Sequence, residues 1–353
     1  MKIGIIGTAG SGKTTLFNAL TGLGVQTGGV RKTHLAAMRV PDTRLEAIAR
    51  IAHCEKTVPV EIFFSDVAGG VGSKPSREHG MDPKLLNLMS AEEAFALVIA
   101  DFEGYVHPGG VVSGALSGAR ELEGDLMLAD LVVVEGKLER IVREHNQGIE
   151  QDTLEKCRHH LEKELPLRTL NLSRDETKTI SSYGFLSQKK GILIRNIGEE
   201  KIGKPEPEGI KDFVRERGLR YIPVAAKLQM EIAQMDTQER AEYAQAMGLE
   251  GFALDTFIQE AFRALDLITF FSIGGHPKEV HAWTTTRGSP AIEAAGRIHS
   301  DMQRGFIRAE VVHYDDYVSY GGETEAKQAG KARSEGKEYI VQDGDIILFR
   351  FNV

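Results

Sequence analysis

The residues best suited to chemistry stand near the start of the chain, in "GTAGSGKT" (residues 7–14). Gly7, Gly12, Lys13 and Thr14 fit the spacing G-x-x-x-x-G-K-[ST], which is typical of loops that hold nucleotide phosphates. Glycines let backbone N–H groups approach phosphate oxygens where a side chain would block them. We expect Lys13 to act as the catalytic charge at the β- and γ-phosphates, and the Thr14 hydroxyl to bind Mg²⁺.

The flanking sequence supports this interpretation over a glycine-rich turn with an incidental lysine. "KIGII" before the loop is typical of a buried strand, and "KTTLFNALTGL" after it is typical of an amphipathic helix. The positive N-terminal end of that helix would point at the phosphates. The predicted phosphate-binding residues are Gly10, Ser11, Gly12, Lys13, Thr14 and Thr15.

A second motif, D-x-x-G, is formed by Asp66 and Gly69 at the end of the apolar stretch "PVEIFF". In a P-loop hydrolase this Asp holds Mg²⁺, usually through water, and the glycine N–H meets the γ-phosphate. We therefore expect Asp66 to be a metal residue and Gly69 a catalytic one, with a surface turn as the alternative. Gly70 follows where a water-orienting Gln would stand, which predicts low turnover.

A third motif, N-I-G-E, would meet the base. It closes the strand "GILIRN", where guanine-specific hydrolases carry N-K-x-D. We expect Asn196 to bond the purine edge, Ile197 to lie against it and Glu199 to reach it, although a turn-capping Asn is the alternative. The longer carboxylate and the missing lysine weaken a preference for guanine. The predicted base-covering backbone is at Ala225 and Ala226, in "VAAK".

These motifs require a doubly wound α/β sheet, and the chain alternates strands and helices accordingly. We expect a first part of the nucleotide-binding domain at 1–111, a helical arm at 112–165, a second part at 166–268 and a separate small sheet domain at 269–353. In the arm, Leu122, Leu126 and Ala129 follow helical spacing. The first arm helix would reach about 45 Å at 1.5 Å per residue. In the last domain, "EYIVQDGDIILFRFN" predicts a hairpin that turns at "QDGD".

Composition restricts the class of protein. The 353 residues carry a net charge of −8, which argues against DNA and against broad, charge-driven nucleic-acid binding but leaves room for a local basic patch. The two cysteines show no metal or redox spacing, so we expect a reducing, cytoplasmic setting. No apolar run of about 18 residues occurs, so we expect no membrane partner.

Several stretches together resemble the YchF-type, Obg-related branch of translation-factor P-loop GTPases. They are "LFNALTG", "VPDTRLEAIA", "DVAG", "LMLADLVVVEGKLERI", "RNIGEE", most of 278–316 and "GKEYIVQDGDIILFRFNV". The resemblance implies an α/β P-loop nucleotide hydrolase domain with an inserted helical coiled-coil arm and a C-terminal β-grasp (TGS) domain. It also implies Mg²⁺ with ATP or GTP, ATP being bound at least as well, and association with the ribosome or ribosomal RNA.

The chain departs from that family's pattern in three places. Gly10 and Ser11 stand where the family's loop carries Asn and Val, and the first-switch threonine aligns ambiguously with Thr27 or Thr33. His79 does not fall where some members place a functional histidine, so we expect it to be a solvated loop residue. Two functions fit: a slow ATPase or GTPase that acts as a conformational switch, and a nucleotide-gated ribosome- or RNA-binding module with negligible hydrolysis. A kinase for a small acceptor fits the loop alone.

Overall fold

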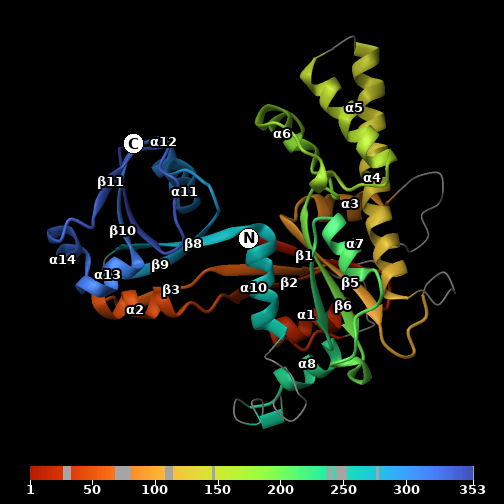
Figure 1. The fold of residues 1–353 in the computed structure, drawn as a ribbon, viewed down its shortest axis with the longest axis horizontal. Coiled ribbons are helices and arrows are strands. Elements are labelled where there is room, and N and C mark those ends of the chain that lie inside the picture. Colours follow the sequence, from red (N-terminus) through yellow and green to blue (C-terminus); the bar gives the residue numbers. More distant parts are fainter. Residues whose placement is uncertain are drawn as a thin grey trace. The chain divides into compact units, whose positions relative to one another are not determined.

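A computed structural model describes residues 1–26, 33–67, 81–107, 114–144, 148–236, 239, 242–243, 253–275 and 278–352. The chain forms two compact units, and each contains a six-stranded sheet. The first unit combines residues 1–37 with 63–264, and the second combines 38–62 with 265–353 (Figure 1).

The sheet of the first unit brings the predicted motifs to one edge. Its order is β2-β4-β1-β5-β6-β7, and the pairs from β4 to β7 are parallel. The chain order reverses at β1, which lies between β4 and β5. Ligands of open α/β sheets bind at the carboxyl ends of the strands beside such a reversal. The strands are β1 (Lys2–Gly7), β2 (His34–Arg39), β4 (Glu61–Asp66), β5 (Ala94–Asp101), β6 (Lys190–Ile197) and β7 (Arg220–Val224).

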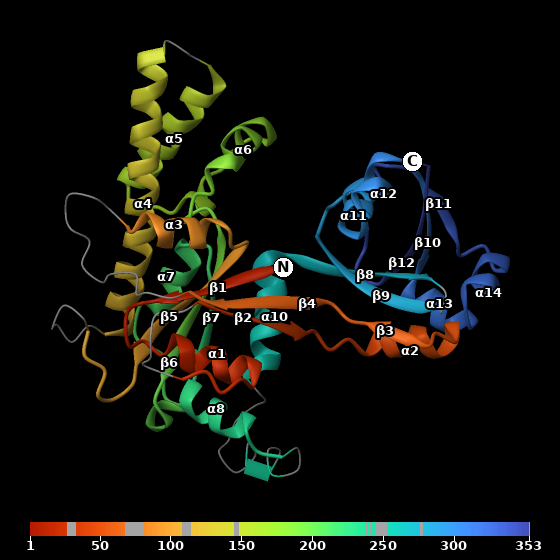
Figure 2. The same cartoon turned by 180° about the vertical axis from the view of Figure 1, so that it is seen from behind.

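Helices cover both faces of this sheet, as its continuously apolar strands require. On one face α1 packs against α8, and on the other α4 packs against β5 and α7 (Figures 1 and 2). The helices are α1 (Lys13–Thr21), α3 (Pro83–Ser90), α4 (Ala115–Glu144), α5 (Ile149–Glu162), α6 (Arg174–Ile180), α7 (Ile210–Glu216), α8 (Ala226–Ala233) and α10 (Ala253–Leu265). Three-residue 3-10 helices are η1 (Leu167–Thr169), η2 (Ser181–Tyr183) and η3 (Glu199–Lys201).

The arm is less separate from the sheet than its sequence suggested. The first half of the 30-residue helix α4 lies in the core of the nucleotide-binding sheet, where it contacts Phe95, Leu97 and Ile99 of β5. The second half pairs with α5 and extends beyond the sheet (Figures 1 and 2). The α4 residues in the sheet core are Ala115, Ala119, Leu122, Leu126 and Ala129.

The expected arm boundary at residue 165 is also too early. Leu167, Ile180 and Phe185 fold back and share one apolar cluster with Leu138 and Leu154 of the paired helices. Buried polar contacts fix this return: Glu123 of α4 accepts two hydrogen bonds from Arg168, at 2.7 and 3.0 Å. The arm is therefore a subdomain that begins inside the sheet core and ends shortly before β6.

The second unit is a mixed sheet with helix α11 (Ala291–Ile298) packed on one face. Its order is β11-β10-β12-β8-β9-β3, with β8 and β12 parallel at the centre between antiparallel neighbours. This arrangement is that expected of a β-grasp domain. The remaining strands and helices are β8 (Leu267–Gly274), β9 (Glu279–Thr286), α12 (Ser300–Arg304), β10 (Phe306–His313), α13 (Tyr314–Tyr320), α14 (Glu323–Gln328), β11 (Arg333–Glu335) and β12 (Asp345–Phe351).

Two elements of the second unit come from the N-terminal third of the chain, which corrects the expected boundaries. Residues 38–62, expected in the nucleotide-binding domain, form α2 (Thr43–Ala52) and β3 (Lys56–Val58). Strand β3 pairs in parallel with β9, and Arg44 of α2 lies over the Phe271 ring, 5.3 Å from its centroid. A C-terminal domain cut at residue 269 would therefore lack part of its own structure.

The expected hairpin at "QDGD" is wrong. Residues 338–341 do not pair with β12. Instead Ile340 forms an isolated bridge with Pro290, and Asp345 accepts hydrogen bonds from the Tyr339 hydroxyl and the Gln342 N–H.

None of the helices in the described parts of the chain is both long enough and apolar enough to cross a membrane.

Candidate functional site

The loop between β1 and α1 has the shape that its glycines predict. Gly10 and Gly12 adopt left-handed backbone angles, with φ of 77° and 92°, which residues with a side chain rarely adopt. A Cβ atom on Gly7 would lie 2.3 Å from the Val98 carbonyl oxygen. One on Gly12 would lie 2.1 Å from Nδ2 of Asn196. The loop therefore needs glycine at 12 for both its conformation and its contact with β6.

Lys13 lies at the start of α1, and its ammonium group fills the loop. Its Nζ donates hydrogen bonds to the carbonyl oxygens of Gly7 and Thr8, at 3.0 and 2.8 Å. Burial lowers the pKa of Lys13 to about 8, against the opposing effect of the Asp66 carboxylate. The negative charge near this ammonium group is too small to offset its burial, and the phosphates of a nucleoside triphosphate would add the missing negative charge. The loop therefore favours an anionic ligand.

Thr14 and Asp66, the two predicted metal residues, are in direct contact. The Thr14 hydroxyl donates a 2.7 Å hydrogen bond to Oδ2 of Asp66, which is 5% exposed at the end of β4. A hydroxyl and a carboxylate are the hard oxygen donors that Mg²⁺ prefers, completed by waters and phosphate oxygens. The pair therefore fits Mg²⁺. In the described parts of the chain, no group of three or more His, Cys, Asp or Glu side chains is placed to hold a metal alone.

Asn196 of β6 links the phosphate loop to the start of α8. Its Nδ2 donates to the Ser11 carbonyl at 2.9 Å, and its Oδ1 accepts from the Ala226 N–H at 3.2 Å. The side chain is 5% exposed. It thus holds the phosphate loop against the turn that begins α8. The sequence had predicted a contact with the purine edge for Asn196, but not this positioning role.

The other residues predicted to contact the base differ in how much of their side chains is exposed. Ile197 is 8% exposed and packs with Ala225, Leu228 and Ile232, so its side chain supports the loop and has little surface for a base. Glu199 is exposed at the first position of η3. Ala225 and Ala226 are buried, so any contact that they make with a base would come from their backbone.

The remaining phosphate-loop residues also fall into two groups. Gly10 is exposed and Thr15 is half-buried, whereas the Ser11 side chain is fully buried. Ser11 Oγ has no hydrogen-bond partner among the described residues. The contribution of Ser11 to a ligand would therefore come from its backbone.

Sequence reasoning missed Tyr105. Its hydroxyl shares a 2.8 Å hydrogen bond with the Thr8 hydroxyl, so the segment after β5 supports the phosphate loop. A contact across 97 residues leaves no local signal in the sequence. Thr33 is exposed. Four residues named from the sequence lie outside the described residues: Thr27, Gly69, Gly70 and His79.

Known proteins resemble this chain along its whole length. A family model, YchF-GTPase_C, described as "Protein of unknown function (DUF933)", matches residues 267–352. The "Ribosome-binding ATPase YchF" of Haemophilus ducreyi is 36% identical over 367 residues, covering 100% of this chain and 99% of that protein. The protein of the same name from Bacillus subtilis is 34% identical over 368 residues, with 100% of both chains covered.

Solved structures agree in fold. The "Structure of the Schizosaccharomyces pombe YchF GTPase" matches with a TM-score of 0.80 and 26% identity, covering 99% of this chain and 97% of that one. A GTP-binding protein from Pyrococcus horikoshii OT3 matches at a TM-score of 0.60 and 17% identity over 100% of both chains, a likeness of fold alone. This chain belongs to the YchF family, and its fold is that of a P-loop NTPase with a C-terminal domain.

Proposed function

We propose that this protein binds a purine nucleoside triphosphate with Mg²⁺ and hydrolyses it slowly as a conformational switch. The observation that carries the proposal is the meeting of Lys13, Thr14 and Asp66 at the carboxyl ends of β1 and β4, with Asn196 holding the phosphate loop from β6. These groups converge on one edge of one sheet although they are up to 183 residues apart (196 − 13).

Each residue has a defined part in this mechanism. Lys13 would neutralise the β- and γ-phosphate oxygens, and the N–H groups of residues 10–15 would hold them at the start of α1. Thr14 and Asp66 would hold Mg²⁺, which when bound withdraws charge from the same oxygens. Gly69 would contact the γ-phosphate.

Hydrolysis should be slow because Gly70 offers no side chain to orient water. A missing arginine finger alone is worth about 10³ to 10⁵ in rate.

The preference between ATP and GTP depends on the residues that face the base. With Glu199 exposed at η3 and no lysine before it, we propose that ATP binds at least as well as GTP. The H. ducreyi and B. subtilis proteins are named ATPases and the S. pombe protein a GTPase, which supports a purine triphosphate.

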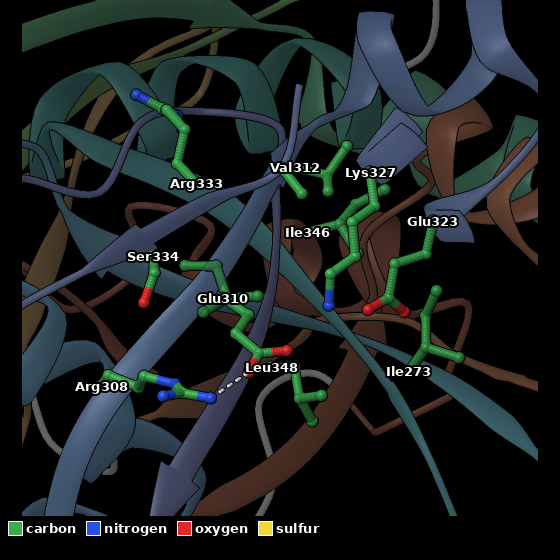
Figure 3. Close-up of a pocket in the computed structure, with 12 residues that line it drawn as sticks. Ile273, Arg308, Glu310, Val312, Glu323, Lys327, Arg333, Ser334, Ile346 and Leu348 are labelled. Carbon is green, nitrogen blue, oxygen red and sulfur yellow. Dashed lines mark hydrogen bonds and ion pairs between the residues drawn. The ribbon is translucent and has the colours of Figure 1, made fainter. Parts of the chain in front are cut away.

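We further propose that the protein works with ribosomes in the cytoplasm, since relatives are named as ribosome-binding. Because the chain is acidic, contact with RNA requires local positive charge. One candidate place is a cavity of about 250 Å³ on the sheet of the second unit, lined by Arg308, Lys327 and Arg333 and also by Glu310 and Glu323, with Arg308 paired to Glu310 at 3.1 Å (Figure 3). Apolar side chains, among them Ile273, Val312 and Ile346, line the rest of it. We propose that this TGS-like domain and the arm are the partner surfaces.

A direct test is calorimetric titration of the purified protein with ATP and with GTP, in Mg²⁺. We expect ATP to bind at least as tightly as GTP, and Lys13→Ala to weaken both by about 1.5–3 kcal/mol, the range for hydrogen bonds to charged groups. Unchanged affinity in that variant would contradict the phosphate site. A tenfold preference for GTP, about 1.4 kcal/mol, would contradict the assignment of the base. Turnover below detection with intact binding would favour the nucleotide-gated binding module instead.

A further inference from the structure

A network of charged and hydroxyl side chains lies beside the loop that follows β6. Arg195 directly precedes Asn196 in β6 and is 4% exposed. Its guanidinium group donates hydrogen bonds to Oδ2 of Asp101 at 2.6 Å and to Oε2 of Glu206 at 2.5 Å. Lys201 donates to the other oxygen of Asp101, also at 2.5 Å. The Tyr221 hydroxyl donates to Glu206. Two cations and two carboxylates are thus joined by direct contacts.

The network ties the loop that carries Glu199 to three neighbouring strands. Lys201 closes η3, two residues after Glu199, and its partner Asp101 is the last residue of β5. Glu206 lies five residues after η3 ends and is held by Arg195 of β6 and Tyr221 of β7. Both ends of the segment 201–206 are therefore tied to the sheet, and the first of them is tied at the carboxyl end of β5.

The apolar side of the same loop is held separately. Ile202 packs against the cluster of Ile197, Ala225 and Leu228, and its N–H donates to the Glu199 carbonyl at 3.2 Å. Packing of this kind keeps a loop near the surface but does not fix where a polar side chain points. Directional ion pairs add that restriction.

Buried ion pairs are poor sources of net stability, because the loss of hydration offsets most of the attraction between the charges. They do fix geometry, since each carboxylate is satisfied only at particular positions of its donors. Burial works against the ionised form of Asp101, yet the hydrogen bonds from Lys201 and Arg195 hold its pKa below the usual value. Asp101 therefore stays charged and keeps both donors in place at neutral pH.

We propose that this network positions the loop after β6 that carries Glu199, which would face the nucleotide base. Asp101, Arg195 and Lys201 would then determine affinity for the base without contacting it and without acting on the phosphates. The inference rests on the proposed function and extends it. The phosphate loop has its own supports in Lys13, Asn196 and Tyr105, and among the described residues no side-chain hydrogen bond or ion pair joins these to Asp101 or Lys201. Base binding and phosphate binding should therefore separate in a variant of the network.

The test compares two ligands that share phosphates and differ in the base. Calorimetry with Mg²⁺ measures binding of ATP and of inorganic tripolyphosphate to the unchanged protein and to Asp101→Asn, which keeps the size of the side chain but removes its charge. We expect ATP affinity to fall tenfold or more and tripolyphosphate affinity to stay within twofold. The matched control is Asp212→Asn, which removes an ion pair with Arg215 that is exposed on both sides.

A second variant guards against a folding defect. Lys201→Met removes the charge from a side chain that is 32% exposed, so the fold should tolerate it, and the same separation is expected. Equal loss of ATP and tripolyphosphate binding, or no loss of either, in a folded variant would overturn the inference alone. If the unchanged protein bound neither ligand, the proposed function would fail and the inference with it.

Discussion

The ionisation of Lys13 gives a quantitative test of the phosphate site. Burial lowers its pKa from an ordinary value of 10.5 to about 8, the nearby Asp66 only partly opposing this. Each unit of change in a pKa corresponds to 1.36 kcal/mol, so burial disfavours the charged form of Lys13 in the free protein by about 3 kcal/mol. A bound triphosphate places several negative charges beside the ammonium and should restore the pKa to its ordinary value or above. Nucleotide binding should therefore take up a proton.

The uptake depends on pH in a way that other groups should not reproduce. With a pKa near 8, roughly a tenth of Lys13 is neutral at pH 7 and roughly three quarters at pH 8.5. Binding of Mg²⁺–ATP should thus take up about 0.1 proton at pH 7 and about 0.75 at pH 8.5. The assay is calorimetric titration in two buffers of different ionisation enthalpy, from which the proton number follows directly.

Lys13→Arg is the matched control, because arginine keeps its charge throughout this range. It should bind ATP, more weakly because its side chain is larger, without measurable proton uptake at pH 8.5. In the free protein the shift also has a defined sign for stability. The unfolded chain holds the Lys13 proton more tightly, so this residue's contribution to stability should rise between about pH 8 and 10.5. Equal proton numbers at pH 7 and 8.5, or uptake in Lys13→Arg, would refute the reasoning.

Three further predictions follow from contacts in the first unit. Glu123→Ala leaves Arg168 charged, buried and without its carboxylate partner, so urea denaturation should show a loss of about 3–5 kcal/mol in the free energy of unfolding; a loss below 1 kcal/mol would mean that the pair is dispensable. Thr14→Ala should weaken ATP binding about tenfold in Mg²⁺, or 1.4 kcal/mol, but hardly at all in EDTA, and equal effects in both would argue against a metal role. Replacing residues 139–156 by a short turn should leave ATP affinity within about twofold, whereas a deletion beginning at 115 should abolish the folded circular dichroism spectrum, because the first half of α4 is core.

The sequence by itself determined those parts of the protein whose chemistry is local. The phosphate loop is eight contiguous residues whose glycines and lysine have one common use, and the structure gives Gly10 and Gly12 the left-handed angles that this use requires. Strands β1, β4 and β6 were predicted from the apolar runs "KIGII", "PVEIFF" and "GILIRN", most of whose residues are buried, a pattern typical of parallel sheets. The long helix α4 was likewise predicted from the spacing of Leu122, Leu126 and Ala129.

Tertiary structure decided where those elements go and what their polar groups meet. Periodicity shows that one face of a helix is buried, but it does not show against what; hence α4 was expected to stand apart, and half of it lies in the sheet core. Strand β3 has three residues, too few for a pattern of its own, and it exists because β9 offers an edge more than 200 residues away. Asn196 gains its partners, Ser11 and Ala226, and Arg195 gains Asp101, only when parallel strands bring their carboxyl ends together. Hydrogen bonds across such separations depend on the register of the whole sheet, which no short stretch of sequence encodes.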